Sequence, residues 1–593
     1  MDPARREAAI AFACSLGLGA ALLWPMPLAP AASLVGHPGN DGWNHAWGYD
    51  WVARALAAGT VPLRDHGLAW PGGGALWFID TAQAALAAPV TWAFGAAAAY
   101  NLVMLVGLAL SAFGAFLLAR RVSGDTAGAA VAAVVYGAAP HLLGQSYNGI
   151  SETVDAGGLP LTLWALLTLL DAPSPGRALR LGLIAGFTVL TSFYVGFFAA
   201  LAAAVVVLGV LATERRSVDW RRAVPGVALA LAVAVAVSAP AFSAFQQSLD
   251  AADGLVKRDP AFVWDSLLRH NVTDVLAFVR PGRTPSPDLK ALYGEDLLIV
   301  ISLGWVALVL AAVGLVGARR PGVLGAWLAL GALFFAFSLG PYLTVGAEPL
   351  LVGGEPVPMP FLAMFELVPV FDRISHPFRF VLGVQLAVAV AAAEGVRWLG
   401  RRAGPRARGL LGAGVAAAVL VEVATLTPAR VPVPLSDARI PAAYAAMAED
   451  PTPGAVLDLP LALPNLERAV YVWAATAHGR PVPWGLNDPM PAFLLGNRLT
   501  ATLLRVEAGR AWTLPGRVPS LDLVVAGRAL ARRGLRYVVL HERLLPAFKR
   551  EQVEAILTGL WGEPARHPAD GLLVWVVPAP ADGAADGAEA ASP

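Results

Sequence analysis

This 593-residue chain has the composition of a membrane protein, since 57% of its residues are hydrophobic and only 14% are charged, against about 25% charged in soluble globular chains. Its 43 basic and 42 acidic residues nearly cancel, which argues against the concentrated basic surface that a nucleic-acid partner requires. The one cysteine, Cys14, excludes an intramolecular disulfide and a cysteine-based metal site.

The first apolar run, residues 7–33, follows Arg5 and Arg6. A cleaved signal peptide has an apolar core of about 7–15 residues, and this run is long enough to cross a hydrocarbon layer of about 30 Å. We therefore expect a retained first helix with a cytoplasmic N-terminus.

Arginine clusters lie at the ends of the later apolar runs, which marks those ends as cytoplasmic. The run at 181–213 has arginines at both ends, so it should form a broken pair of helices with a turn at 192–196. With the first helix and this pair, the sequence predicts about eleven membrane-spanning helices. The others are expected near 99–119, 126–141, 156–171, 223–243, 296–317, 322–345, 379–397 and 408–427.

This topology predicts a multi-pass membrane protein with a transmembrane domain over 1–429. The many Ala, Gly and Arg residues are typical of a GC-rich bacterial gene and favour the bacterial inner membrane. Its long loops and its tail should lie on the outer, extracytoplasmic side. The cytoplasmic loops are short and rich in arginine, whereas the outer loops hold most carboxylates and histidines. We therefore expect any chemistry on the outer face. The predicted outer loops are 34–98, 141–158, 244–295 and 346–378.

The tail, residues 430–580, predicts a small extracytoplasmic α/β domain. Short β-branched runs predict strands at 456–460, 537–541 and 572–577. Amphipathic patterns predict helices at 521–533 and 546–560. The low-complexity end, 581–593, is expected to be disordered.

A second pattern follows the first helix, where Trp43, Trp47 and Trp51 recur every four residues. Tryptophans at this spacing predict a short helix lying in the membrane interface. Asn40 or Asp41 is placed to cap that helix. Asp41 has two interpretations: a helix cap, or a carboxylate that acts as a general base or binds a metal.

In layout, nearly the whole chain resembles the GT-C superfamily of membrane glycosyltransferases, which includes the protein O-mannosyltransferases and the lipid A aminoarabinose transferase. The first element of the resemblance is a helix followed by an outer loop with an acid, Asp41, leading into an interfacial helix. The other elements are HGLAWPGGGALW (66–77), SYNGISETVDAGGLPL (146–161), FDRISHPFRF (371–380), VLDLP (456–460), YVWAATAHGRPVPWG (471–485) and LRYVVLH (535–541).

The resemblance implies a polytopic α-helical GT-C-like fold and a polyprenyl-phosphate-linked sugar as donor. It also implies that the catalytic carboxylate of the first loop is Asp41. Many members carry two adjacent acids there, whereas here the neighbour is Asn40 and position 37 is histidine. No cofactor is therefore assigned, and a divalent cation shared by Asp41 and Glu152 stays open.

Four further charged residues are candidates for the same site. Glu152 and Asp155 are the only charged residues between Asp125 and Asp171, and acids beside a membrane span are functional candidates. Glu152 is our candidate for a second catalytic acid, and Asp155 for substrate binding. Arg373 and Arg379 flank Ser375-His376-Pro377, where a guanidinium suits a donor phosphate.

Three histidines, His45, His376 and His478, are candidates for binding the acceptor or substrate. His45, His66 and His478 are scattered and give neither HExxH nor a Cys/His pattern, so no zinc site is predicted. Each is also compatible with a structural role.

These expectations define a glycosyltransferase that moves a sugar from a polyprenyl-phosphate carrier to an unknown glycan, lipid or protein acceptor outside the membrane. Two alternatives stay open: a transporter or flippase of lipid-linked saccharides, and a non-catalytic scaffold of the same fold. The missing second acid beside Asp41 is the feature that favours the scaffold.

Overall fold

The computed structural model describes residues 2–39, 41–214, 217–255, 260–282, 297–318, 321–369, 371–486, 489–511 and 520–579. The chain forms two compact units. The helical unit consists of Met1–Leu63, Trp77–Ala251 and Val256–Arg439. The α/β unit consists of Arg64–Leu76, Ala252–Leu255 and Ile440–Pro593.

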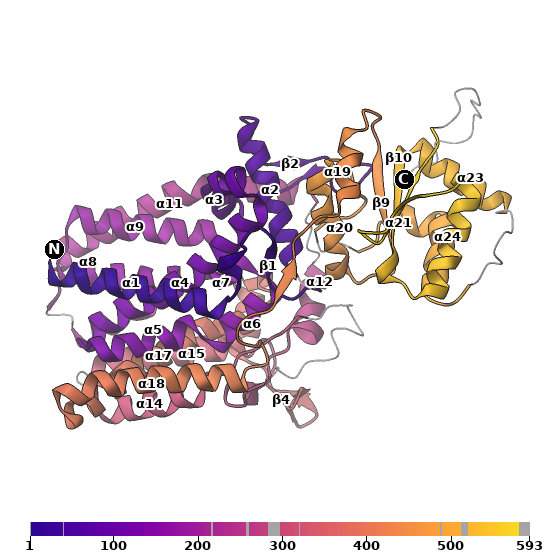
Figure 1. The fold of residues 1–593 in the computed structure, drawn as a ribbon. Helices are drawn as coiled ribbons and strands as arrows, with labels where there is room; N and C mark the ends of the chain where they lie inside the picture. The colour runs from indigo at the N-terminus through magenta and orange to yellow at the C-terminus, as the bar shows by residue number, and fades with distance from the viewer. Residues whose placement is uncertain are drawn as a thin grey trace. The chain divides into compact units, whose positions relative to one another are not determined.

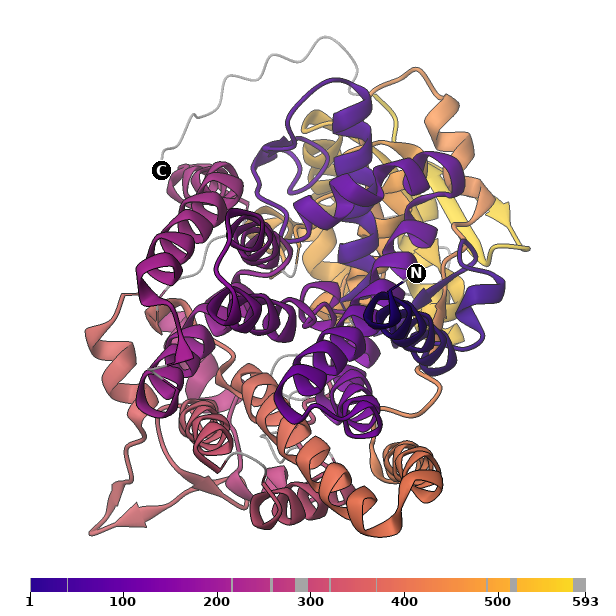
Figure 2. The same cartoon turned by 90° about the vertical axis from the view of Figure 1, so that its left-hand side faces the viewer.

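Within the helical unit the long helices run side by side (Figure 1) and are seen nearly end-on in Figure 2. Among the described residues, 7 helical stretches are long and apolar enough to cross a membrane. They are Ala96–Ser123, Thr126–Asn148, Ser151–Asp171, Phe193–Thr213, Trp220–Asp250, Pro377–Ala403 and Ala407–Leu426. The chain is thus an integral membrane protein.

Four other predicted spans correspond to helices that are shorter or more charged. They are α1 (Pro3–Leu22), α9 (Pro175–Thr191), α14 (Trp305–Val316) and α15 (Pro321–Ser338). The total of about eleven spans therefore stays a prediction.

The predicted break inside 181–213 is confirmed at Ser192. This residue ends α9 and precedes α10 (Phe193–Thr213) with an extended backbone, and its hydroxyl accepts a hydrogen bond from Val195 N–H at 3.3 Å. A serine in this position satisfies one of the free N–H groups at the start of a helix. The run at 181–213 is therefore divided between two helices, α9 and α10, which pack against each other.

Small residues bring α14 against α17 (Val381–Ala403) at backbone distance. A Cβ added at Gly314 would lie 2.0 Å from the carbonyl oxygen of Ala391, and one added at Gly395 would lie 2.1 Å from that of Leu310. Helices in lipid associate through such close packing, because lipid tails are as apolar as leucine.

The segment predicted as an outer loop, 141–158, is helical and mostly buried, and its place on the outer side of the membrane stays a prediction. It contains α6 (Pro140–Asn148) and α7 (Ser151–Val154). The Asn148 amide donates to the Leu298 carbonyl at 3.0 Å and accepts from Leu298 N–H at 2.7 Å. Polar residues that suggest a loop in the sequence are here satisfied inside the protein.

The helix predicted after the first span is α2 (Gly42–Ala57), but its tryptophans do not form a membrane-facing stripe. Trp43 and Trp47 are 5% and 4% exposed, and Trp47 stacks on Trp51 with ring centroids 5.7 Å apart. The interfacial assignment is therefore wrong for the first two tryptophans, because their shared face is covered by protein.

The α/β unit is built on a four-stranded sheet of order β11-β12-β10-β9. β9 (Ala455–Leu459) is parallel to β10 (Leu535–His541), whereas β12 (Leu572–Val576) is antiparallel to β10 and to β11 (Ala565–His567). The three predicted strand segments correspond to β9, β10 and β12. The two predicted helices correspond to α23 (Leu521–Arg532) and α24 (Ala547–Trp561).

Part of the first predicted outer loop belongs to this α/β unit. Val456 N–H donates to the Pro481 carbonyl at 2.9 Å, and Val482 N–H donates to the Gly67 carbonyl at 2.7 Å. Trp70 N–H in turn donates to the Val482 carbonyl at 3.0 Å. Residues 64–76 thus join the α/β unit through backbone hydrogen bonds to Val482, long-range contacts that the predicted boundaries miss.

The boundary after the last membrane helix also differs from the predicted 430. Residues 430–439 belong to the helical unit, where β8 (Leu435–Asp437) pairs antiparallel with β1 (Ser33–Val35). The α/β unit resumes at Ile440. The predicted disordered end, 581–593, lies outside the described residues.

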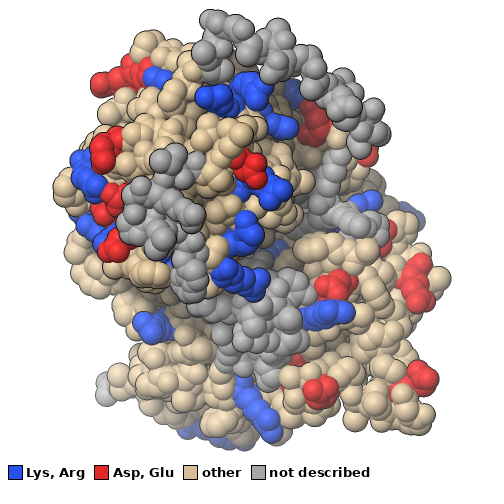
Figure 3. Space-filling model, turned by 90° about the vertical axis from the view of Figure 1, so that its right-hand side faces the viewer, with Lys and Arg blue, Asp and Glu red and all other residues tan. Residues whose placement is uncertain are grey.

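Basic and acidic side chains are interspersed on the face shown in Figure 3, over the part that the structure describes. Several pair within the α/β unit: Arg566 with Glu554, Arg550 with Glu542, and Arg536 with Asp450. Such exposed pairs contribute little stability each, and they leave a mixed surface rather than one of a single sign.

Candidate active site

Four segments of the helical unit bring charged side chains into one cluster. His45 lies one turn after Asp41 on α2, so both share a helix face. Asp80 lies directly before α3 (Thr81–Phe94), and Glu152 lies on α7. Arg379 lies in the short helix η6 (Pro377–Phe380) that leads into α17. We call these five residues the carboxylate–histidine cluster.

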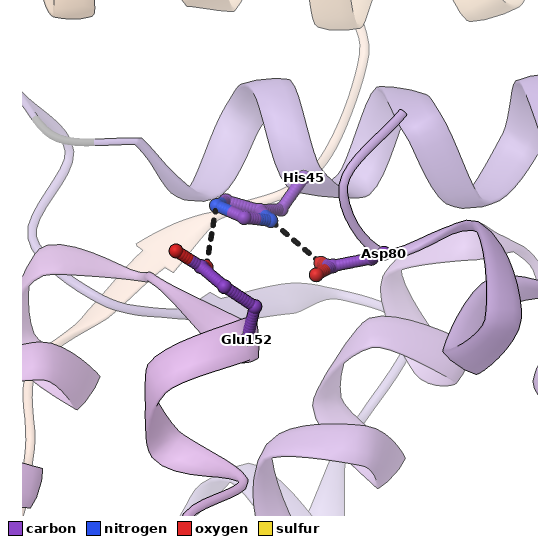
Figure 4. A group of neighbouring side chains, drawn as sticks. All are labelled: His45, Asp80 and Glu152. Carbon is purple, nitrogen blue, oxygen red and sulfur yellow. Dashed lines mark hydrogen bonds and ion pairs between the residues drawn. The ribbon is translucent and has the colours of Figure 1, made fainter. Parts of the chain in front are cut away.

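One side of the His45 ring is held by Asp80 and Ser151. Asp80 is fully buried, and its Oδ2 accepts a hydrogen bond from His45 Nδ1 at 2.6 Å (Figure 4). The Ser151 hydroxyl donates to the same carboxylate and lies 3.1 Å from Nδ1. Because a carboxylate only accepts, Nδ1 carries a proton and Nε2 is directed away from Asp80.

The other side of the ring faces two further carboxylates. Nε2 lies 3.8 Å from Asp41 Oδ2 and 3.7 Å from Glu152 Oε2. These distances are too long for hydrogen bonds. Glu152 Oε2 is buried and has no hydrogen-bond partner among the described residues.

Glu152 is oriented by Arg379, whose Nη1 lies 3.3 Å from Oε1. Both side chains are buried, at 5% and 7% exposure. The Arg379 guanidinium also lies over the Tyr194 ring, 4.7 Å from its centroid, a favourable cation–π geometry. The arginine is therefore fixed from two sides before any ligand binds.

Charge in the cluster favours a cation at His45. Burial lowers the pKa of His45, but the negative charges of Asp80 and Asp41 and the hydrogen bond to Asp80 outweigh burial and raise the pKa well above its usual range. The cluster thus stabilises positive charge between its three carboxylates.

The same donor set fits a divalent cation on the Nε2 side of the ring. His45, Asp80 and Glu152 offer ligand atoms within 4.8 Å of one another. However, His45 Nδ1 and Asp80 Oδ2 are only 2.6 Å apart, whereas two ligands of one ion with bonds of about 2.1 Å are separated by about 3 Å or more. Asp41 Oδ2 lies 3.8 Å from His45 Nε2, a separation that two ligands of one ion can have. The ligand set that fits is therefore His45, Glu152 and Asp41, without Asp80.

Two other candidates lie beside this cluster. Asp41 occupies the cap position of α2, but its side chain caps no helix N–H; it accepts from the Asn44 amide at 2.9 Å. Its neighbour Asn40 lies outside the described residues. Asp155 is largely enclosed and accepts from the Gln83 amide at 3.2 Å.

The remaining candidates are not among the five residues of the cluster. Arg373 is exposed and its ion pair is with Asp372, 3.7 Å away. His376 lies against the Tyr194 ring, with centroids 6.3 Å apart, and its Nδ1 is 2.8 Å from the Ser375 hydroxyl.

His478 belongs to the α/β unit, as the last residue of α20 (Asn465–His478). It is buried, and its Nδ1 accepts a hydrogen bond from Arg480 N–H at 3.0 Å. This contact gives His478 a structural role at the end of its helix.

Sequence reasoning missed Asp80 and Ser151. Asp80 precedes an apolar helix, where an acid is usually a cap, yet its side chain makes no cap hydrogen bond. A fully apolar neighbourhood, Trp77-Phe78-Ile79, is the signal that marks it as a buried acid.

Comparisons with known proteins give a fold but no sequence family. No family model and no curated protein matches the sequence. Among solved structures, the mycobacterial arabinofuranosyltransferase AftD matches 97% of the chain with a TM-score of 0.56 at 17% identity. The Archaeoglobus fulgidus oligosaccharyltransferase in the apo form matches 90% of it with a TM-score of 0.51 at 13% identity.

These neighbours are GT-C glycosyltransferases, so the resemblance to that superfamily is confirmed at the level of the fold. The match covers 40% of AftD and 69% of the oligosaccharyltransferase. The chain therefore has the GT-C fold and spans less than half of AftD.

Proposed function

We propose that this protein is a GT-C glycosyltransferase that moves a sugar from a polyprenyl-phosphate-linked donor to an acceptor on the outer side of the cytoplasmic membrane. The observation that carries the proposal is the convergence of Asp41 and Glu152 on His45, with Arg379 paired to Glu152. These residues are far apart in the sequence, and a buried cluster of this charge is costly unless it serves a ligand.

The neighbouring structures support a lipid-linked donor. One of them is the archaeal oligosaccharyltransferase AglB in complex with an inhibitory peptide and a dolichol-phosphate, which matches 94% of this chain with a TM-score of 0.51. A polyprenyl phosphate presents the same chemistry, a phosphate on a long isoprenoid chain at the membrane surface.

The mechanism we propose is a single displacement. Asp41 accepts the proton of the acceptor hydroxyl while that oxygen forms a bond to the anomeric carbon of the sugar. The bond between this carbon and the phosphate oxygen breaks, and the lipid phosphate leaves with the electron pair. A phosphate leaves readily, so one base and one cationic group suffice.

Arg379 is the cationic group of this proposal. Its guanidinium presents a planar set of donors suited to phosphate oxygens, and its Nε has no hydrogen-bond partner in the described part of the chain. Glu152 and Tyr194 orient it. A divalent cation, when bound, supplies further positive charge for the phosphate. Arg373, exposed and paired with Asp372, stays outside this arrangement.

The test is sugar transfer by purified protein carrying Asp41→Asn. Losing a general base lowers the rate by about 10²–10⁴, whereas a side chain that only accepts the hydrogen bond from the Asn44 amide can be replaced by asparagine without loss of rate, because the amide oxygen accepts the same bond. Asp50→Asn on the same helix is the matched control, since Asp50 pairs with Arg54, and it should transfer at the wild-type rate. Unchanged transfer by a folded Asp41→Asn protein would remove Asp41 from the mechanism.

A further inference from the structure

We propose that Asp80 and Ser151 are positioning residues that make His45 Nε2 a metal ligand beside Asp41 and Glu152, and that this ligand set selects Mn²⁺-type transition cations over Mg²⁺ and Ca²⁺. The inference rests on the proposed function only in treating the carboxylate–histidine cluster as the reactive site. It concerns two residues to which the transfer mechanism gives no role.

The first step concerns the ring orientation. Asp80 Oδ2 lies 2.6 Å from His45 Nδ1, and Ser151 donates to the same carboxylate from α7. Metal-bound histidines commonly donate their second ring N–H to a carboxylate, which fixes the tautomer and makes the ligating nitrogen more basic. Asp80 is fully buried, so solvent does not compete for this contact.

The second step concerns the ligand atoms opposite Asp80. Glu152 Oε1 pairs with Arg379 at 3.3 Å. The other oxygen, Oε2, is buried, lies 3.7 Å from His45 Nε2 and has no hydrogen-bond partner among the described residues. Asp41 brings Oδ2 to 3.8 Å from the same nitrogen. An unsatisfied buried carboxylate oxygen is costly, and a cation between these three atoms satisfies it.

The third step concerns the choice of ion. Mg²⁺ and Ca²⁺ prefer sites made wholly of oxygen ligands, whereas imidazole nitrogen favours first-row transition cations. A site with one imidazole and two carboxylates therefore binds Mn²⁺ and its heavier neighbours more tightly than Mg²⁺ of the same charge.

The experiment is Mn²⁺ binding to the purified full-length protein in detergent, followed by electron paramagnetic resonance at one fixed pH without donor or acceptor. Wild type should bind one Mn²⁺ that shows hyperfine coupling to an imidazole nitrogen, and an equal concentration of Mg²⁺ should leave it bound. His45→Gln should lose the nitrogen coupling. Asp80→Asn should weaken the affinity about 10–100-fold, as removal of such supporting carboxylates does.

Three controls separate positioning from general damage. Asp50→Asn, which removes the partner of Arg54 on α2, should bind Mn²⁺ as wild type does, and Ser151→Ala should weaken Mn²⁺ binding less than Asp80→Asn. Thermal unfolding without metal checks that each variant is folded. A positioning role changes the nitrogen coupling, whereas a merely structural role leaves the coupling intact in the folded fraction.

Three results would overturn the inference: no Mn²⁺ bound by folded wild type, displacement of Mn²⁺ by equal Mg²⁺, or unchanged affinity and coupling in Asp80→Asn. Since no sugar donor is present, these results are independent of transfer. Binding as expected with no transfer activity would refute the proposed function alone.

Discussion

At the scale of single residues, the candidate site depends on two buried carboxylates that are each satisfied on one side only. Glu152 pairs through Oε1 with Arg379, and Asp80 accepts through Oδ2 from His45 and Ser151. The second oxygen of each has no hydrogen-bond partner among the described residues. Native proteins retain such atoms chiefly where a ligand, an ion or water completes them.

The Glu152–Arg379 pair gives a stability prediction. Arg379→Met leaves a buried carboxylate without its cation, and breaking a buried pair typically destabilises by about 3–5 kcal/mol. Adding Glu152→Gln removes the unpaired carboxylate charge, so the double variant should recover most of the lost unfolding free energy. Unfolding in mixed detergent measures both variants, and strictly additive losses would show that the two side chains do not interact.

Glu507 gives a pH prediction for the α/β unit. It ends α22 (Arg498–Glu507) and accepts hydrogen bonds from Leu461 and Ala462 N–H at 3.0 and 2.7 Å. Burial outweighs these hydrogen bonds and raises the pKa of Glu507 to about 7. The folded state then holds a proton that the unfolded state has released, so stability falls by about 3 kcal/mol as the pH rises from about 4.5 to about 7.

Hydrogen exchange in α22 of the full chain, corrected for intrinsic rates, measures this effect of Glu507. Protection should decrease across that pH range in wild type and in the exposed-residue control Glu551→Gln. Glu507→Gln should abolish the dependence. A pH-independent wild type would contradict the raised pKa.

Sequence reasoning identified Glu152 because charged residues are scarce between Asp125 and Asp171. It identified Asp41 from its place before a predicted helix and from the resemblance, and Arg379 from the suitability of a guanidinium for phosphate. It could not identify Asp80 and Ser151 as partners of His45. These contacts join residues 35 and 106 positions apart, and only the packing of α2, α3 and α7 brings them together. The roles of all these residues stay proposals.

At the scale of elements, the helical unit depends on glycines at the contact between α14 and α17. Gly395→Ala places a Cβ 2.1 Å from the Leu310 carbonyl oxygen, and relieving such overpacking costs about 1–3 kcal/mol. Gly414→Ala is the matched control on α18 (Pro405–Leu426), because its Cβ meets nothing within 4 Å. Alanine favours a helix over glycine by about 1 kcal/mol.

Thermal unfolding in detergent should therefore show a lower melting temperature for Gly395→Ala and an unchanged or higher one for Gly414→Ala. Equal melting temperatures for the two variants would mean that α14 and α17 do not approach at backbone distance.

Elements differed in how well their sequence predicted them. The break at Ser192 followed from length and flanking arginines, which are local signals. The periodicity of Trp43, Trp47 and Trp51 correctly placed a helix, but periodicity says which residues share a face, not what covers it. Protein covers Trp43 and Trp47, so the membrane-facing assignment failed.

At the scale of the whole molecule, residues 64–76 and the tail must lie on one side of the membrane, because they form one unit. After Cys14→Ala removes the only cysteine, single cysteines at Gly72 and Leu521 should both react with a membrane-impermeant thiol reagent in intact cells. Gly176→Cys, in the first turn of α9 next to Arg177, should react only after permeabilisation. Labelling of Gly72→Cys without Leu521→Cys would contradict the shared unit.

The overall layout was readable from composition, because spans, arginine clusters and β-branched runs are each continuous in sequence. The backbone hydrogen bonds that join Gly67 and Trp70 to Val482 could not be predicted in this way, because contacts between residues more than 400 positions apart are not visible in local composition. The structure therefore adds chiefly long-range contacts to what the sequence predicts.

The most direct test of the central claim is transfer by the wild-type protein itself, reconstituted in vesicles with labelled polyprenyl-phosphate sugars and a membrane extract as acceptor source. The proposed function requires the labelled sugar to pass to the acceptor fraction while polyprenyl phosphate accumulates in equal amount, and Asp41→Asn to abolish both. Folded protein that releases no polyprenyl phosphate from any donor of a broad panel would contradict the account and favour a transporter or scaffold.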